Sequence, residues 1–386
     1  MNVAPRLLTN LCYLAMMSLA IGLNLLPVFL TTLSALYGGA AGLTQEQLGR
    51  LGAISFAGLV VGILITGPLA DRWGAKPFVQ LGNALIAVGL VAAAFAPNYA
   101  SLGAALFLFG FGAGVLDMVL SPVVAALNPD RRAAAMNWLH SFYCLGAGVT
   151  IIAGTLALRL GFGWREACLV LLPLPLGLMF AYAPLRFPAL SVAGGRVKLR
   201  TLLRRGWFLL AMVGIFLGGA TELGMAQWLP AYAETSLGFP VWVGGATLLA
   251  FSLAMMAGRM VVGAAGPRWN PYRVMAWGCA SSVLLFLAAS FLPVPGFALA
   301  ACIAVGFTGS CLWPTMLAVT ADRYPDGGAT MYGALGAFGN MGGICMPWVV
   351  GWVADRTDLH WGLAVSALAP LLMLPLVLGL GRTAKA

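Results

Sequence analysis

A run of small and charged residues separates two long apolar segments of this chain: Gly67-Pro68-Leu69-Ala70-Asp71-Arg72-Trp73-Gly74-Ala75-Lys76. The segments on either side, 48–69 and 77–95, are close to the ~20 residues that an α-helix needs to cross a bilayer. Glycine tolerates the backbone of a sharp turn, and three charges favour water over lipid. The run therefore predicts a very short loop at one membrane face, between two membrane-spanning helices.

The amino-acid composition excludes a water-soluble particle. Of 386 residues, 61% are hydrophobic and 8% are charged, which leaves too little polar surface to cover a globular protein. The seven cysteines lie in apolar segments without metal-ligand spacing, so we interpret them as core residues and expect no metal site. The sequence contains no phosphate-binding Gly-Lys-Ser/Thr loop and no catalytic constellation, and we expect neither an enzyme nor a cofactor.

Apolar segments recur along the chain, separated by polar residues, proline or glycine. They predict an all-α integral membrane protein with about twelve transmembrane helices on the ~20-residue criterion. The first segment is too long for a cleavable signal and is expected to stay as the first helix. The expected spans are residues 7–34, 46–69, 77–95, 100–126, 134–158, 166–185, 207–233, 241–264, 273–292, 296–320, 330–353 and 360–380.

Lys and Arg are distributed unequally between the two sets of loops. If the N-terminus is cytoplasmic, 17 of the 21 basic residues fall on the cytoplasmic side. Arg259 is one of these 17. The positive-inside rule therefore places both termini in the cytoplasm of a protein of the cell (inner) membrane. The net charge of +10 then reports topology, and we expect lipids rather than nucleic acid as partners. The four exceptions are Arg50, Arg159, Arg165 and Arg356.

A hydrophilic linker, residues 186–206, divides the chain into an N-terminal bundle, 1–185, and a C-terminal bundle, 207–386. Two patterns recur across it. Asn24-Leu25-Leu26-Pro27 is similar to Gln227-Trp228-Leu229-Pro230, and Ser121-Pro122 before Asp130-Arg131 matches Trp313-Pro314 before Asp322-Arg323 at the same offset. The repeat predicts two pseudo-symmetric six-helix bundles with a midplane site, as in transporters.

The loop at 67–76 resembles the signature G-x-L-A-D-R-x-G-x-K of the major facilitator superfamily, through Gly67, Asp71, Arg72, Gly74 and Lys76. The resemblance covers essentially the whole chain. It implies that this loop latches the two halves together on the cytoplasmic side in one state of the transport cycle. Asp71 can face the positive N-terminal end of a neighbouring helix, such as one that begins near Thr330. The alternative is a basic turn that only fixes topology.

Two segments resemble the fucose-permease-like, or sugar-porter-like, branch of this superfamily. Residues 112–117, which end in Asp117 ahead of Ser121-Pro122, resemble its fourth helix, and residues 137–146 resemble its fifth. The acid that some members carry in the first helix for proton coupling is absent here, and Asn24 is the nearest polar residue. The resemblance implies a polar solute, with a sugar as the first choice.

Buried acids indicate where protons could be carried. Asp117 and Glu222 lie inside expected spans, where a carboxylate costs ~2.5–3.5 kcal/mol unless it faces a cavity or takes up a proton. We assign them, with His140, as candidates for proton coupling, and Asp117 is the first choice because Asn137 and His140 lie at a similar depth. A neutral acid bonded to a neighbouring helix is the structural alternative for each carboxyl group.

The helices that line the cavity in this family carry amide and indole side chains. Aromatic rings cover the C–H face of a polyhydroxylated solute and amides bind its hydroxyls, whereas the alternative for each tryptophan is packing or anchoring at the interface. The predicted substrate-binding residues are Asn24, Asn137, Gln227, Trp228, Trp313 and Asn340.

These features favour a monomeric secondary transporter that moves a small polar organic solute, a sugar, by proton symport. Facilitated uniport and proton-coupled export of amphipathic drugs are the alternatives. The drug antiporters carry a Gly-Pro pair in the fifth helix, whereas Gly146-Ala147-Gly148 occupies that region here. A membrane sensor that transports nothing is the third hypothesis, and it predicts large soluble appendages that the sequence lacks.

The latch hypothesis is testable at one carboxylate. If Asp71 stabilises the closed cytoplasmic face through a helix terminus, Asp71→Asn shifts the population toward the inward-open state and lowers transport while the fold stays intact. Cysteine-accessibility labelling from each side of the membrane measures the shift. Unchanged accessibility together with full transport would contradict the hypothesis.

Overall fold

The computed structural model describes residues 3–128, 132–188, 199–265, 269–324 and 328–383, and all regular secondary structure in these residues is helical. Within them, eleven stretches are long and apolar enough to cross a membrane. A further long helix, α15 (Gly328–Ala354), coincides with the expected span 330–353 but is rich in glycine. The all-α membrane fold predicted from the sequence is therefore confirmed.

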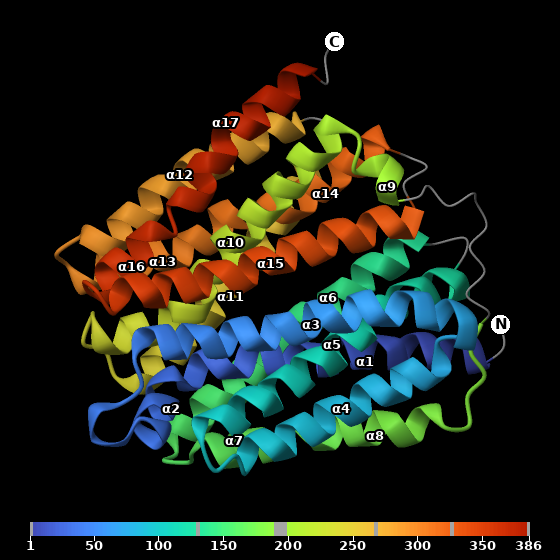
Figure 1. Cartoon of the computed structure of the whole chain (residues 1–386), viewed down its shortest axis with the longest axis horizontal. Helices are drawn as coiled ribbons and strands as arrows, with labels where there is room; N and C mark the ends of the chain where they lie inside the picture. The colour runs from blue at the N-terminus through green and yellow to red at the C-terminus, as the bar shows by residue number, and fades with distance from the viewer. Residues whose placement is uncertain (1–2, 129–131, 189–198, 266–268, 325–327, 384–386) are drawn as a thin grey trace. The chain divides into compact units, whose positions relative to one another are not determined.

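The helices cluster into two units. The first unit comprises residues 1–42 and 54–193. Within it α1 lies against α5 and α6, and α4 lies against α5 and α8 (Figure 1). Its elements are α1 (Val3–Leu25), the 3-10 helix η1 (Leu26–Phe29), α2 (Leu30–Tyr37), η2 (Gly39–Ala41), most of α3 (Gln45–Trp73), α4 (Lys76–Ala94), α5 (Tyr99–Leu127), α6 (Arg132–Arg159), α7 (Trp164–Val170) and α8 (Pro173–Tyr182).

The second unit comprises residues 43–53 and 194–386, so the first turns of α3 belong to it. Within it α10 lies against α11, α15 and α17, and α12 lies against α13 and α17. Its further elements are α9 (Leu199–Leu202), α10 (Gly206–Thr235), α11 (Val241–Ala265), α12 (Pro271–Phe291), α13 (Pro295–Gly309), α14 (Leu312–Arg323), α15, α16 (Leu359–Val365) and α17 (Leu368–Thr383).

Four of the expected spans are divided into two or three helical pieces. Each break lies at or just before a proline, namely Pro27 in η1, Pro173 at the start of α8, Pro314 in the first turn of α14 and Pro370 in the first turn of α17. Proline has no N–H to donate, and its ring displaces the preceding turn. In lipid such a break persists only where other protein groups satisfy the freed backbone atoms.

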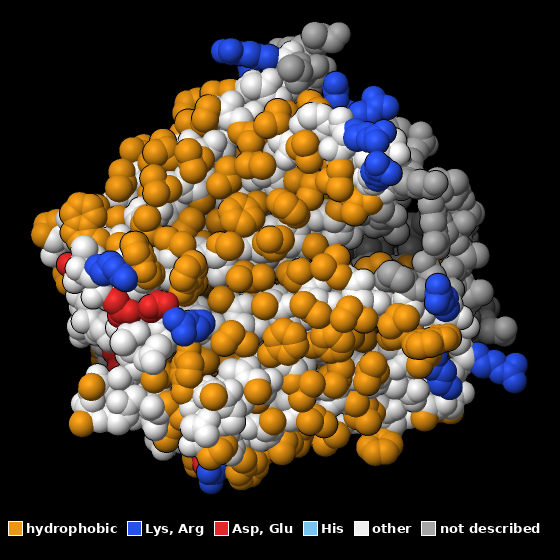
Figure 2. All heavy atoms as spheres, in the orientation of Figure 1, with side chains coloured by type: hydrophobic (Ala, Val, Ile, Leu, Met, Phe, Trp, Pro, Cys, Tyr) orange, Lys and Arg blue, Asp and Glu red, His pale blue; other side chains and the backbone are white. Residues whose placement is uncertain are grey.

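The surface agrees with lipid as the solvent. On the face drawn in Figure 2, hydrophobic side chains cover the helices, and charged side chains gather toward the helix ends. Large apolar side chains face outward on several helices, including Phe180 and Trp277, each 74% exposed. A soluble monomer rarely exposes so much contiguous apolar surface. These positions are therefore lipid-facing.

Glycine brings α3 and α5 into backbone contact in the first unit. A methyl group added to Gly58 would lie 2.2 Å from the Phe107 carbonyl oxygen, and one added to Gly110 would lie 1.9 Å from the Ser55 carbonyl oxygen. One turn further along, a methyl group added to Gly114 would lie 2.1 Å from the Leu59 carbonyl oxygen. Without a large hydrophobic driving force in lipid, such close approach is what holds membrane helices together.

The second unit repeats this contact between α11 and α13. A methyl group on Gly258 would lie 2.5 Å from the Phe307 carbonyl oxygen, and one on Gly306 would lie 2.6 Å from the Phe251 carbonyl oxygen. Each unit therefore contains a pair of helices whose separation is set by glycine. This similarity accords with the internal repeat in the sequence.

We expect Gly110→Ala to destabilise the protein by about 1–3 kcal/mol, because the new methyl group meets backbone that cannot rotate away. Gly103→Ala is the matched control on the same helix, since its methyl group would meet only the end of the Ile54 side chain, at 3.4 Å. Alanine there gains about 1 kcal/mol of helix propensity. Thermal unfolding of the purified variants measures both. Equal midpoints for the two variants would contradict the packing argument.

Candidate functional site

A proline frees one carbonyl in the middle of the tenth span. Pro314 has no N–H, so the carbonyl oxygen of Ser310, four residues earlier, loses its helical partner. The chain is not helical at Ser310 and Cys311, and α14 begins at Leu312. Arg259 on α11 supplies a donor, because its Nε lies 3.3 Å from the Ser310 carbonyl oxygen. The break in this span is thus tied to an arginine of a neighbouring helix.

The same arginine forms an ion pair. Its Nη2 donates to Glu222 Oε2 of α10 at 3.0 Å, and both residues lie inside candidate membrane spans. A lone charge at this depth costs several kcal/mol, whereas a hydrogen-bonded pair is neutral as a whole. The side chains are 33% exposed for Arg259 and 20% exposed for Glu222, so the pair is not sealed inside the packed core.

Arg259 corrects one interpretation of the sequence. The count of loop charges placed it on the cytoplasmic side, but it lies within α11, in the span Val241–Val262. The count was wrong there because a long side chain inside an apolar segment was treated as part of the following loop. An arginine within residues 241–264 was itself the signal of an intramembrane site.

The predicted substrate residues of α10 are packed inside the second unit. Trp228 is fully buried, and its indole N–H donates to the Pro347 carbonyl oxygen at 2.9 Å. Gln227 is 4% exposed, and its Nε2 has no hydrogen-bond partner among the described residues. The Trp228 hydrogen bond therefore links α10 to α15. The side-chain N–H groups of Gln227 are buried and have no acceptor among the described residues.

The other predicted substrate residues have local partners where the structure describes them. Asn24 donates to the Ala20 carbonyl oxygen at 2.8 Å, and Asn340 donates to that of Gly336 at 3.0 Å. The Trp313 ring occupies space left by Gly219 and Gly339, where a methyl group would lie 2.9 and 2.4 Å from ring atoms. Trp313 therefore packs between α10 and α15, close in sequence to the break at Ser310.

The proton-coupling candidates of the first unit are only partly described. Asp117 lies in α5 and is partly buried. Asn137 and His140 lie in α6, but their side chains fall outside the described residues. The grouping of these three residues stays a prediction.

The loop motif forms the expected turn. Gly74 has a φ of +77°, a left-handed conformation that glycine adopts without strain. Lys76 donates to the Ala183 carbonyl oxygen at 2.7 Å, Gly67 lies against Met118, and Arg72 is exposed. The Asp71 side chain lies outside the described residues, so the latch stays a prediction.

A cluster around His360 was not found from the sequence. Its Nδ1 lies 2.8 Å from the Ser290 carbonyl oxygen and 2.7 Å from the Tyr232 hydroxyl, which donates to the Ala289 carbonyl oxygen at 2.7 Å. Two side chains from α10 and α16 thus satisfy carbonyls at the end of α12. His360 and Asp358 border a cavity of about 430 Å³. A histidine at the first position of the last expected span, 360–380, was the available signal.

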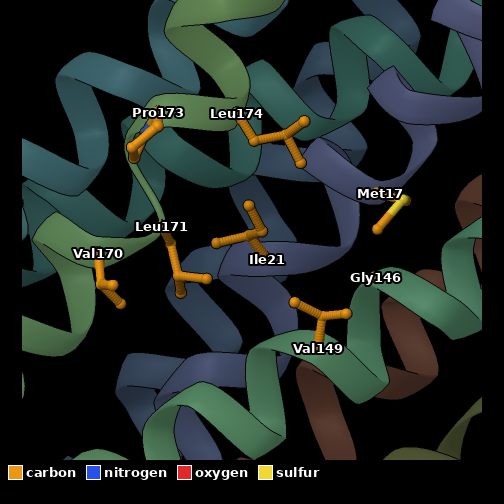
Figure 3. Close-up of a pocket in the computed structure, with 8 residues that line it drawn as sticks. All are labelled: Met17, Ile21, Gly146, Val149, Val170, Leu171, Pro173 and Leu174. Carbon is orange, nitrogen blue, oxygen red and sulfur yellow. The ribbon is translucent and has the colours of Figure 1, made fainter.

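A second cavity, of about 220 Å³, lies in the first unit and is apolar (Figure 3). Met17 and Ile21 of α1, Val149 of α6, and residues from the end of α7 to the start of α8 surround it. It offers no charged side chain to a polar solute. The ion pair of α10 and α11 is therefore the better candidate for a functional site.

Comparison with known proteins identifies the family. The model of the Major Facilitator Superfamily matches residues 11–327. The chain belongs to this superfamily. It is 30% identical to the gentisate transporter of Corynebacterium glutamicum over 353 residues, which cover 84% of this chain and 76% of that protein. It is 29% identical to the human monocarboxylate transporter 11, over 75% of this chain and 65% of that protein.

Solved structures agree on the fold of this superfamily member. The xylose transporter of E. coli superposes with a TM-score of 0.77, over 97% of this chain and 98% of that one. The sequence identity is 11%, so the likeness concerns the fold alone. The superfamily and the relatives are transporters, in keeping with a protein that is not an enzyme.

The coupling between Glu222 and Arg259 can be measured. We expect Glu222→Gln and Arg259→Gln each to lower thermal stability, because each leaves one charge inside the membrane without its partner. The double variant should lose less than the sum of the two, with a coupling of about 1 kcal/mol or more. Thermal unfolding of the four purified proteins closes this cycle. Additive losses would show that the two side chains do not depend on each other.

Proposed function

We propose that this protein is a proton-coupled symporter of small organic anions, in which Arg259 binds the carboxylate of the solute and Glu222 carries the proton. The observation that carries the proposal is the Glu222–Arg259 pair inside the second unit, 3.0 Å apart and partly exposed. A guanidinium forms two parallel hydrogen bonds to a carboxylate, which gives it geometric preference for this group.

The names of the relatives point to the same chemistry. Gentisate is an aromatic carboxylate, and the second relative is named for monocarboxylates. A sugar, the solute expected from the sequence, offers hydroxyls but no charge to balance an intramembrane arginine. Once Glu222 is protonated and releases Arg259, the guanidinium requires a new negative partner, which an anion supplies and a sugar does not.

Charge balance explains how one proton accompanies one anion. In the empty site Glu222 is ionised and neutralises Arg259. When the carboxylate of the solute forms an ion pair with the Arg259 guanidinium, Glu222 loses its partner. Glu222 then takes up one proton, which leaves it neutral beside a neutral Arg259–solute pair. Both the empty and the loaded site then have zero net charge, which lowers the cost of carrying them through the low-dielectric centre of the membrane.

We further propose a monomer in the cell (inner) membrane with both termini in the cytoplasm, on the basis of the loop charges. The proton gradient across that membrane would then drive the anion inward. A uniporter would use the same anion site but would show no dependence on the gradient, and a drug exporter would prefer cationic or neutral amphiphiles.

Uptake into proteoliposomes tests the proposal. With an alkaline lumen, the protein should accumulate radiolabelled gentisate or benzoate above the external concentration, and xylose should not compete. Arg259→Gln should raise KM on the order of 30-fold or more, because it removes a buried charged hydrogen bond. Glu222→Gln should keep exchange between internal and external anion but lose accumulation driven by the pH gradient.

Asp117→Asn is the comparison variant, because Asp117 was the first choice from the sequence. If accumulation is lost in Asp117→Asn and kept in Glu222→Gln, the coupling acid lies in the first unit. Uptake of xylose but not of gentisate or benzoate would instead indicate that the solute is a sugar.

A further inference from the structure

The N-terminus of α3 is only half capped by its own residues. Thr44 and Gln47 form a capping box: the Thr44 hydroxyl accepts from the Gln47 N–H at 3.1 Å, and Gln47 Oε1 accepts from the Thr44 N–H at 2.9 Å. The Leu48 N–H bonds to the Thr44 carbonyl oxygen. The local cap leaves the N–H groups of Gln45 and Glu46 without an acceptor in their own helix.

Asp355 accepts both remaining bonds. Its Oδ1 lies 2.6 Å from the Gln45 nitrogen, and its Oδ2 lies 2.7 Å from the Glu46 nitrogen. Asp355 directly follows α15, more than 300 residues further along the chain. A carboxylate on two N–H groups at the positive end of a helix forms charge-assisted bonds and meets the helix dipole.

Residues 43–53, which we name the α3 head, comprise Leu43, Thr44 and the first nine residues of α3, and they contact α15 and α10. A methyl group on Gly351 would lie 2.2 Å from the Gln45 carbonyl oxygen, and one on Gly49 would lie 2.4 Å from the Pro347 carbonyl oxygen. The Trp348 indole N–H donates to Glu46 Oε1 at 3.1 Å. Backbone and side chains therefore both contribute to the contact between the α3 head and α15. Asp355 adds two hydrogen bonds at the N-terminal end of α3.

The α3 head covers Gln227. A methyl group on Gly52 would lie 2.8 Å from the Gln227 amide, which is 4% exposed and keeps a donor without a partner in the part of the chain that the structure describes. The rest of α3 clusters with the first unit, so α3 is divided between the two units. A movement of one unit against the other must therefore either bend α3 near residue 53 or release its head.

We propose that Asp355 is a gating residue, whose carboxylate holds the α3 head on α15 and keeps Gln227 covered until the two N–H bonds break. The charge count places this end of α3 on the outer side. The sequence Ala354-Asp355-Arg356 also repeats Ala70-Asp71-Arg72 from the loop motif at the other end of α3. The proposal concerns opening of the protein and depends neither on the solute nor on Arg259.

Maleimide labelling of one cysteine at Gln227 tests the gate without any solute. The seven native cysteines are replaced by serine, Gln227→Cys is introduced, and the labelling rate of the purified protein is measured. Loss of a capping carboxylate should shift the open fraction about fivefold, so Asp355→Asn should speed labelling by about that factor. Hydrogen exchange of residues 43–53 should accelerate in parallel.

Asp358→Asn is the matched control. It neutralises an exposed carboxylate three residues away, which caps α16 through the Trp361 N–H at 3.0 Å but does not contact the α3 head. It should leave both readouts unchanged. Gln45→Pro is the second variant: proline fits the first position of a helix and removes one of the two N–H groups while Asp355 stays intact, so it should also speed labelling.

The outcomes are separable. Faster labelling and exchange in Asp355→Asn and Gln45→Pro, with the control unchanged, support the gate. Equal labelling rates in the parent and in either folded variant overturn it, as does an equal acceleration in Asp358→Asn. Failure of anion uptake would leave these rates unaffected, so the gate and the proposed solute are tested separately.

Discussion

Every backbone N–H and C=O in a membrane needs a partner from the protein, and the interactions that distinguish this chain arise where a helix cannot supply one. Pro314 leaves the Ser310 carbonyl without its helical donor, and Arg259 takes its place. The end of α12 offers carbonyls that Tyr232 and His360 satisfy, and the start of α3 offers two N–H groups that Asp355 satisfies. Polar side chains thus gather at helix breaks and helix ends.

Glycine is the second condition for this arrangement. The hydrogen bonds that the Asp355 carboxylate accepts from the α3 head form where the backbones of two helices approach closely. Gly351 and Gly49 permit that approach on the second unit, and Gly58 and Gly110 permit it between α3 and α5. Since lipid gives little hydrophobic reward for association, close packing and polar bonds have to hold the helices together. Close helix packing is thus the physical reason for the glycines at these contacts, which are part of the 50 in the chain.

The ion pair and the helix break act at the same place. Arg259 contacts Glu222 on α10 and the Ser310 carbonyl at the break of the tenth span, so three spans meet at one guanidinium. In the proposed mechanism the guanidinium exchanges Glu222 for the carboxylate of the solute, and protonation of Glu222 keeps the net charge of the site at zero. The proposed anion symport rests on this arrangement, because the ion pair supplies both a cation for the solute and a carboxyl group for the proton.

The sequence by itself determined the membrane class, the positions of the eleven candidate spans found in the described residues, the turn at Gly74 and the superfamily, because hydropathy and turn chemistry are local properties of the chain. It also identified Glu222 as a carboxyl group inside an expected span and therefore as a candidate functional residue. It did not find Arg259 as the partner of Glu222, nor Asp355 as the cap of α3, since these pairs are separated by 37 and more than 300 residues. Only the tertiary structure decided which side chain meets each unsatisfied backbone group, because a partner distant in sequence is chosen by how the helices pack and not by any local pattern.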